Sequence, residues 1–232
     1  MIIPGRHRCV LFDLDGTIAE TEGRAHLPAF NHAFREAGLP WHWRREDYRR
    51  LLKTAGGVER LFRFAQENGE DAEALRERLL QVHRAKNRHV AQIMQSGAVP
   101  ARAGFRALVM TLALNNIAWG VVTTTSRANW EALWTYSLAP LVIPEPAVIV
   151  CGEDVSAKKP DPEAYELALA RLGLSALRCC AIEDSRNGML AARQAGLPVA
   201  IVKSEFFADE LFDEAQVVVD ELTELMPELM GA

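Results

Sequence analysis

Two carboxylates follow an apolar stretch near the amino terminus. Asp13 and Asp15 come directly after the apolar run 9–12, and Gly16 follows them. If that run is a strand, both carboxylates lie at the carboxyl edge of a sheet, where open α/β folds bind their ligands. One carboxylate can attack phosphorus, while the other protonates the leaving oxygen and later activates water. The alternative is an acidic strand-to-loop junction without chemistry.

Polar residues also end three later apolar runs. Thr123 offers a hydroxyl to a phosphoryl oxygen, or merely caps the following helix. Lys159, or its neighbour Lys158, can offset the charge between a nucleophilic carboxylate and a phosphate. Glu183 and Asp184 are acidic ligands of the kind that Mg²⁺ takes together with phosphate oxygens and water, although Asp184 could instead cap a helix. Together these residues predict phosphoryl transfer that depends on magnesium.

The elements that must position these residues are short apolar strands separated by helical patterns. Strands that are apolar on both faces are typical of parallel sheets covered by helices. The sequence therefore predicts an α/β fold with a Rossmann-like, doubly wound parallel sheet. The predicted strands are 9–12, 117–122, 147–150, 179–182, 198–202 and 217–219, and the predicted helices that cover them include 104–114, 126–136, 162–172 and 185–195.

A long helical segment interrupts this alternation after the first strand. No strand-like run occurs between about residues 19 and 97, where apolar residues recur at helical spacing instead. The sequence predicts an inserted helical bundle at 19–98 within a core made of 1–18 and 99–232. Its predicted helices are 29–37, 48–52, 58–65 and 74–94.

Composition limits the classes of partner. The 232 residues carry 26 Lys and Arg against 31 Asp and Glu, a formal net charge of -5, with no basic block that would favour nucleic acid. No leader-like segment and no apolar run of about 20 residues is apparent, so we expect no membrane association and a cytoplasmic location. A monomer is expected, and the four cysteines are predicted to be buried, reduced thiols. His83 and His89 are six residues apart on one predicted helix and make a poor metal pair.

The candidate catalytic and metal-binding residues resemble, in their order and spacing, the four motifs of the haloacid dehalogenase superfamily. The resemblance implies that Asp13 is the nucleophile and Asp15 the general acid and base. It implies that Thr123 and Lys159 hold the phosphoryl group. Magnesium is implied on Asp13, the Asp15 carbonyl and Asp184, with Glu183 close by. The motifs are D-x-D-G-T from Asp13, the threonine Thr123, K-K-P-x-P from Lys158 and E-D-S-x-x-G from Glu183.

The helical insertion resembles the mobile cap of the superfamily, which closes over the site and reads the substrate. Several of its segments resemble the CbbY-like subgroup, among them Ala19-Glu20-Thr21-Glu22, Trp41-His42-Trp43, Gly56-Gly57-x-Glu59-Arg60 and His83-x-x-Lys86. The characterised activity of that subgroup removes one phosphate from xylulose-1,5-bisphosphate, an inhibitor of Rubisco. Two positions depart from the subgroup, because Leu27 and Val58 stand where basic residues are usual.

The resemblance also implies a set of substrate contacts. We expect Arg60 to bind the distal phosphate or a sugar hydroxyl, the alternative being a solvated helix arginine. The full set of candidate substrate-binding residues is Glu20, His26, Arg60, Lys86, Thr124 and Asn129.

The predicted function is a magnesium-dependent phosphatase that hydrolyses a small sugar phosphate or bisphosphate through an aspartyl-phosphate. The alternative is a sugar phosphomutase resembling β-phosphoglucomutase, which shares the motifs and the cap. A noncatalytic binding module is disfavoured because the residues of all four motifs are intact.

Overall fold

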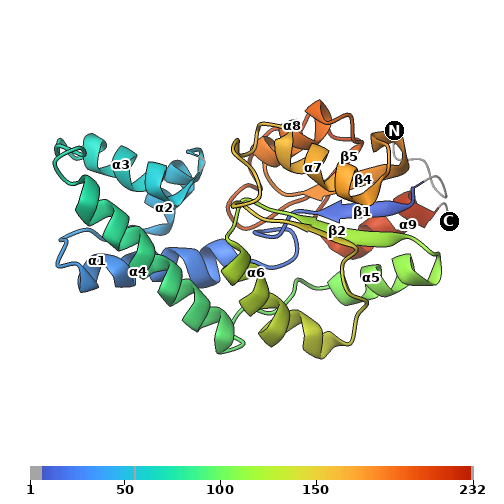
Figure 1. Ribbon diagram of the computed structural model, residues 1–232, viewed down its shortest axis with the longest axis horizontal. Coiled ribbons are helices and arrows are strands. Elements are labelled where there is room, and N and C mark those ends of the chain that lie inside the picture. Colours follow the sequence, from blue (N-terminus) through green and yellow to red (C-terminus); the bar gives the residue numbers. More distant parts are fainter. Residues whose placement is uncertain (1–6, 55, 231–232) are drawn as a thin grey trace.

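A six-stranded parallel sheet forms the middle layer of one half of the molecule (Figure 1). The computed structural model describes residues 7–54 and 56–230. Along the sheet the strand order is β3-β2-β1-β4-β5-β6, and every neighbouring pair is parallel. The predicted α/β fold is confirmed, and each predicted strand matches an observed one to within one residue at either end. The strands are β1 (Cys9–Phe12), β2 (Ala118–Val122), β3 (Val148–Val150), β4 (Cys179–Glu183), β5 (Val199–Val202) and β6 (Val217–Val219).

The central strand β1 sets the register of the site. Phe12, its last residue, lies opposite Val121 of β2 and Ile182 of β4. The three strands therefore end at nearly the same level, and the residues that follow them meet at one edge of the sheet. The parallel arrangement brings side chains together there that are far apart in the sequence.

Helices cover both faces of the sheet. Along β1, Val10 and Phe12 belong to one buried cluster while Cys9 and Leu11 belong to another, as the alternation of a strand requires. The first cluster packs against α5, α6 and α9, and the second against α7 and α8. These helices are α5 (Phe105–Leu114), α6 (Arg127–Leu133), α7 (Glu163–Leu172), α8 (Arg186–Gln194) and α9 (Leu225–Met230).

The residues between β1 and α5 form an all-helical lobe beside the carboxyl edge of the sheet (Figure 1). The lobe has a hydrophobic cluster of its own, centred on Phe30, Trp43 and Tyr48. This separate cluster supports our proposal that residues 19–98 form a cap. The helices of the lobe are α1 (Leu27–Glu36), α2 (Arg45–Leu52), α3 (Gly57–Glu67) and α4 (Arg76–Gln95), and the π-helical turn Glu22–His26 precedes them.

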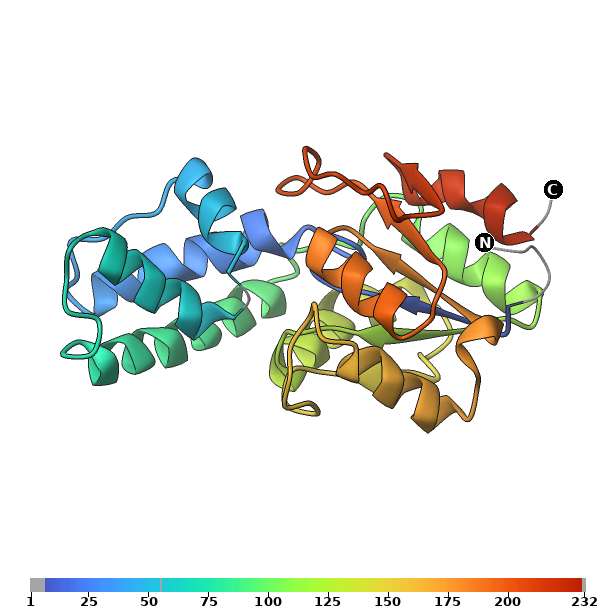
Figure 2. The same ribbon diagram turned by 90° about the horizontal axis from the view of Figure 1, so that it is seen from above.

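One segment of the sheet half reaches into the helical lobe. The loop between β5 and β6 extends toward the lobe (Figure 2), and its Phe206 is a buried member of the lobe's hydrophobic cluster. The Phe206 ring contacts the Tyr48 ring edge to face, with centroids 5.6 Å apart. Arg45 forms an ion pair with Glu205, and Arg49 with Asp209 at 3.0 Å. The loop therefore ties the two halves together.

Two further observations concern the described residues. All four cysteines are buried and free, as predicted. In the part of the chain that the structure describes, no helix has both the length and the apolar character needed to cross a membrane.

The position of Phe206 leads to a stability prediction. We expect Phe206→Ala to lower the free energy of unfolding by about 3 kcal/mol, because it removes a buried ring and leaves a cavity in the cap cluster. The control is Leu211→Ala in the same loop, where the side chain is 70% exposed and the expected change is within about 0.5 kcal/mol. Urea unfolding followed by circular dichroism measures both, and equal losses would contradict the packing role of Phe206.

Candidate active site

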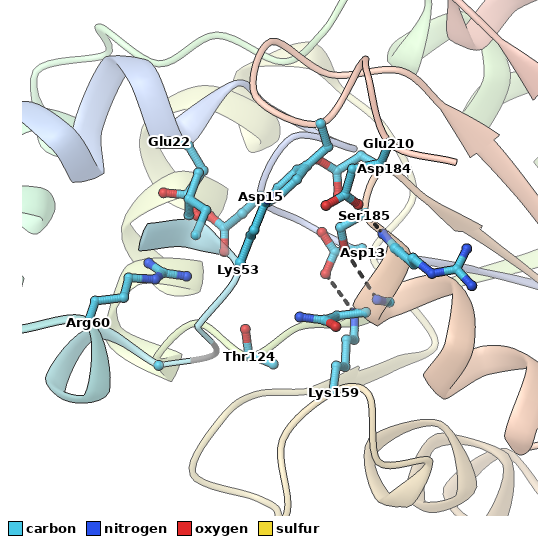
Figure 3. Close-up of a pocket in the computed structure, with 16 residues that line it drawn as sticks. Asp13, Asp15, Glu22, Lys53, Arg60, Thr124, Lys159, Asp184, Ser185 and Glu210 are labelled. Carbon is cyan, nitrogen blue, oxygen red and sulfur yellow. Dashed lines mark hydrogen bonds and ion pairs between the residues drawn. The ribbon is translucent and has the colours of Figure 1, made fainter. Parts of the chain in front are cut away.

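Asp13 and Lys159 form a buried ion pair at the carboxyl edge of the sheet (Figure 3). The Lys159 Nζ donates to Asp13 Oδ1 at 2.7 Å and to the Val122 carbonyl at 2.7 Å. Burial acts to raise the pKa of Asp13, while the Lys159 ammonium acts to lower it. Lys158 points elsewhere and lies 3.8 Å from Glu59 of the lobe. Of the two candidate lysines, the structure brings Lys159 to the nucleophile position.

Glu183 holds Lys159 from the other side. Its Oε1 accepts from Lys159 Nζ at 2.6 Å and from the Tyr165 hydroxyl at 2.5 Å. The Lys159 ammonium also lies 5.1 Å from the centroid of the Tyr165 ring. The lysine is thus fixed between two carboxylates and an aromatic face, and these carboxylates act to raise its pKa against the opposing effect of burial. Such a lysine remains an ammonium throughout the physiological range.

Asp13, Glu183 and Asp184 form a buried acidic cluster whose ligand oxygens all lie within 4.8 Å of one another. Asp184 Oδ2 and Glu183 Oε2 are buried and have no hydrogen-bond partner. Burial raises the pKa of Asp184, and the charges of Asp13 and Glu183 raise it further. A hard divalent cation removes this repulsion and uses the free oxygen of Asp184. The residues present therefore fit the predicted magnesium ion.

Two glycines leave room for this cluster. A Cβ on Gly16 would lie 2.0 Å from Asp184 Oδ2, and one on Gly188 would lie 1.9 Å from Glu183 Oε2. Gly16 also has a φ of +92°, a backbone conformation that favours glycine. A larger residue at either motif position would clash with Asp184 or Glu183, which explains why glycine stands there.

Asp15 is held by the first residues of the helical lobe. Its Oδ1 accepts from the Thr21 hydroxyl at 2.5 Å and lies 3.2 Å from His26 Nε2. Burial acts to raise the pKa of Asp15, but the hydrogen bonds and charge of His26, with help from Thr21 and Lys86, lower it overall. Asp15 is therefore kept as a carboxylate in this arrangement. His26, expected to contact the substrate, contacts Asp15 and also lines a pocket that adjoins the cleft.

The structure places the Thr123 side chain outside the residues that line the cleft. Its hydroxyl is fully buried and accepts from the backbone N–H of Thr125 at 3.1 Å. The backbone N–H of Thr123 still pairs with Val150 of the next strand, so its side chain follows the alternation of the sheet into the interior. The next residue, Thr124, is exposed and lines the cleft with Asp13, Asp15 and Lys159. We therefore propose that Thr124, one of the candidate substrate-binding residues, makes the phosphoryl contact, while the expected role of Thr123 stays a prediction.

The lobe supplies the opposite wall of this cleft (Figure 3). Arg60 lines it and is fixed by a hydrogen bond from its Nε to the Thr54 carbonyl at 3.0 Å. An adjoining pocket shares Asp15 and Arg60 and adds Lys86 and Asn129. Burial is the main cause that lowers the pKa of Lys86 to about 8. Carboxylates of the sheet edge thus line one side of the cleft, and the cationic side chains of Arg60 and Lys86 form a cationic wall on the side of the lobe.

Glu20 does not line this cleft or the adjoining pocket. Its carboxylate accepts from the backbone N–H of Glu205 at 3.3 Å and lies 3.5 Å from Arg102, at the junction of the two halves. Glu22 lines both pockets instead and accepts a hydrogen bond from the Tyr48 hydroxyl. We therefore replace Glu20 with Glu22 among the candidate substrate contacts.

The two residues that depart from the subgroup pattern, Leu27 and Val58, both lie in the helical lobe. Leu27 is 8% exposed and belongs to the hydrophobic cluster of the lobe. Val58 is half-buried near the start of α3, and neither residue lines the two pockets. Leu27 thus contributes to packing in the lobe.

Sequence reasoning missed some of these positions for physical reasons. Nothing in the sequence shows that Tyr165 supports Glu183, because their contact depends on how α7 packs against β4. The choice between Thr123 and Thr124 depends on where the alternation of β2 ends. Glu22 could have been predicted from the sequence, since it stands in the same short motif as Glu20.

A model of haloacid dehalogenase-like hydrolases matches residues 7–196. The chain belongs to this family, as its motifs predicted. Within the family it resembles CbbY proteins. The plasmid-encoded CbbY of Cupriavidus necator is 40% identical over 218 residues, which cover 93% of this chain and 85% of that protein.

Solved structures of CbbY from Rhodobacter sphaeroides agree with this similarity. The structure in complex with phosphate has a TM-score of 0.86 and 37% identity, and the match covers 96% of this chain and 99% of that one. A variant in complex with xylulose-1,5-bisphosphate has the same TM-score and coverage, at 36% identity. The predicted resemblance to the CbbY-like subgroup is confirmed, and the chain is a phosphatase of the haloacid dehalogenase family.

The placement of the two threonines gives a direct test. We expect Thr124→Val to lower kcat/KM by about a hundredfold, since a hydroxyl in the cleft that stabilises phosphoryl charge is lost. The matched control is Thr123→Val one residue earlier, for which kcat/KM should change far less. Steady-state phosphate release compares the variants. A large loss in Thr123→Val together with an intact Thr124→Val would restore the original assignment.

Proposed function

We propose that this phosphatase hydrolyses a small sugar phosphate or bisphosphate, of the kind represented by xylulose-1,5-bisphosphate, with Mg²⁺ and through an aspartyl-phosphate. The observation that carries the proposal is the pairing of the buried Asp13 and Lys159 with the cationic wall that contains Arg60. A substrate with a phosphate at one end and further anionic or hydroxyl groups at the other matches both walls.

In the first step, an oxygen of Asp13 attacks phosphorus, and the bond from phosphorus to the sugar oxygen breaks. Asp15 in its protonated form gives its proton to the departing oxygen. Lys159 and Thr124 stabilise the charge on the phosphoryl oxygens. In the second step, Asp15 removes a proton from water, which attacks the aspartyl-phosphate and releases inorganic phosphate with Asp13 regenerated.

Asp13, Asp184 and the Asp15 carbonyl would hold the magnesium ion, with Glu183 next to them. When bound, Mg²⁺ screens the repulsion between the anionic nucleophile and the anionic ester. The lowered pKa of Asp15 keeps it deprotonated and therefore available as the base of the second step. Entry of a phosphate between Asp15 and the cluster adds negative charge, which favours protonated Asp15 for the first step.

The substrate class rests on the helical lobe. Arg60 and Lys86 line the cleft and its adjoining pocket and can bind an anionic group remote from Asp13. The complex of the Rhodobacter sphaeroides CbbY variant with xylulose-1,5-bisphosphate supports a bisphosphate. Residue 27 is a leucine in the lobe's hydrophobic cluster, so the distal group relies on Arg60 and Lys86. A cytoplasmic monomer stays a prediction from the sequence.

The chemistry is tested by removing the nucleophile and the metal. We expect magnesium-dependent phosphate release that chelation abolishes and added Mg²⁺ restores. Asp13→Asn should lower kcat by at least about a thousandfold, because no attacking carboxylate remains. The exposed Asp213→Asn serves as the control and should retain full activity. Undiminished turnover in Asp13→Asn contradicts the proposal. So does conversion of β-glucose 1-phosphate, primed with a trace of bisphosphate, to its isomer without free phosphate.

Substitution of Arg60 tests the proposed substrate class. Arg60→Ala should raise the KM for a sugar bisphosphate by about tenfold while leaving that for p-nitrophenyl phosphate unchanged, since only the bisphosphate reaches the cap wall. Arg63→Ala, three residues along the same helix, is the matched control because Arg63 pairs with Glu67. Kinetics across a panel of sugar mono- and bisphosphates give these constants. Unchanged KM values for every hydrolysed substrate would remove Arg60 from the site.

A further inference from the structure

A second group of potential metal ligands lies on the outside of the helical lobe. It consists of His32 and Glu36 on α1 and His89 on α4. None of the three lines the catalytic cleft or its adjoining pocket. His32 and Glu36 stand four residues apart, so they share one face of α1, and that face packs against α4.

The polar atoms of this group converge on one point. His89 Nε2 lies 2.9 Å from His32 Nδ1 and 2.7 Å from Glu36 Oε2. Two further contacts hold the set in place: Gln92 Oε1 lies 3.2 Å from His89 Nδ1, and Arg88 donates to Glu36 Oε1 at 2.9 Å. One oxygen of Glu36 is therefore engaged from outside, while the other faces the two imidazoles.

A cation between the three side chains fits these contacts. If Nδ1 of His89 donates its proton to Gln92, the lone pair on Nε2 points at the Glu36 carboxylate, which is unfavourable. The other tautomer, in which Nε2 donates to Glu36, a second proton on His89 or a metal cation relieves this contact. Gln92 accepting from Nδ1 is also the outer contact that orients a metal-binding histidine with its other nitrogen toward the ion.

We propose that His32, Glu36 and His89 form a surface binding site for a borderline transition-metal ion, of which Zn²⁺ is the type. Ligands at about 2.0 to 2.1 Å from Zn²⁺ are roughly 3.4 Å apart in a tetrahedral site. The observed separations of 2.9 and 2.7 Å are short of this spacing by about 0.5 and 0.7 Å. Small side-chain shifts on exposed helix faces supply that difference.

The donor set selects the class of ion. Two imidazole nitrogens and one carboxylate suit Zn²⁺, Cu²⁺ or Ni²⁺, whereas Mg²⁺ prefers oxygen ligands. The acidic cluster at Asp13 and the cluster on the lobe thus differ in metal preference. Because its ligands come from both α1 and α4, an ion in the outer site links two helices of the lobe and stabilises their packing.

The site is tested by Zn²⁺ titration of the full chain, without an added histidine tag, after chelator treatment and in excess Mg²⁺. Isothermal titration calorimetry should show one Zn²⁺ bound per chain in wild type. The same binding should persist in Asp184→Asn, which disables the acidic cluster. His32→Ala and Glu36→Gln should each weaken Zn²⁺ binding by at least about tenfold.

His42→Ala is the matched control, since His42 is an exposed histidine of the lobe outside the group, and it should bind Zn²⁺ like wild type. Zn²⁺ should raise the melting temperature of wild type and of His42→Ala but not that of His32→Ala. Loss of all Zn²⁺ binding in Asp184→Asn overturns the proposal, as does wild-type affinity in His32→Ala. His32→Ala and Glu36→Gln change exposed groups, and circular dichroism without metal verifies that these variants and Asp184→Asn fold.

Discussion

Three buried carboxylates and one buried ammonium at a single edge of the sheet are the constraint on which the site depends. Asp13, Glu183 and Asp184 lie close enough to repel one another, and Lys159 compensates only part of their charge. Removing such groups from water costs several kcal/mol each unless partners replace the lost solvation. The excess negative charge makes the edge receptive to a divalent cation and explains why two carboxylate oxygens there are left without a protein donor.

The fold delivers these groups from separate parts of the chain because parallel strands all end at the same side. β1, flanked by β2 and β4, places Asp13, the proposed nucleophile, at the centre of the sheet. Gly16 and Gly188 then allow the acidic side chains to approach the backbone more closely than any larger residue permits. Asp15, the proposed acid and base, differs from the rest, since its partners Thr21 and His26 come from the start of the helical lobe. Its proton affinity is therefore set by Thr21 and His26 across the junction of the two halves.

Much of the fold and of the central site was predictable from sequence. The apolar runs located all six strands, because strands buried on both faces leave a strong local pattern. The acidic pairs were placed for the same reason, directly after those runs. Contacts set by packing left no local signal. Examples are Tyr165 on Glu183, Phe206 within the lobe, and His89 beside His32, which lies 57 residues earlier. Which of the adjacent residues Thr123 and Thr124 faces the cleft depends on the last paired residue of β2, which has no local signal in the sequence.

The anchoring of Phe206 limits how freely the two halves can be recombined. The ring belongs by sequence to the segment between β5 and β6, yet it completes the hydrophobic interior of the inserted bundle. If the helical bundle of a relative replaced this one, it would need an aromatic residue at the position of Tyr48 to pack against Phe206. Without it, the Phe206 ring would be exposed to water. Exchange of the inserted bundle in evolution therefore requires matching substitutions in the bundle and in the segment between β5 and β6. The insertion is thus a less independent unit than its position in the chain suggests.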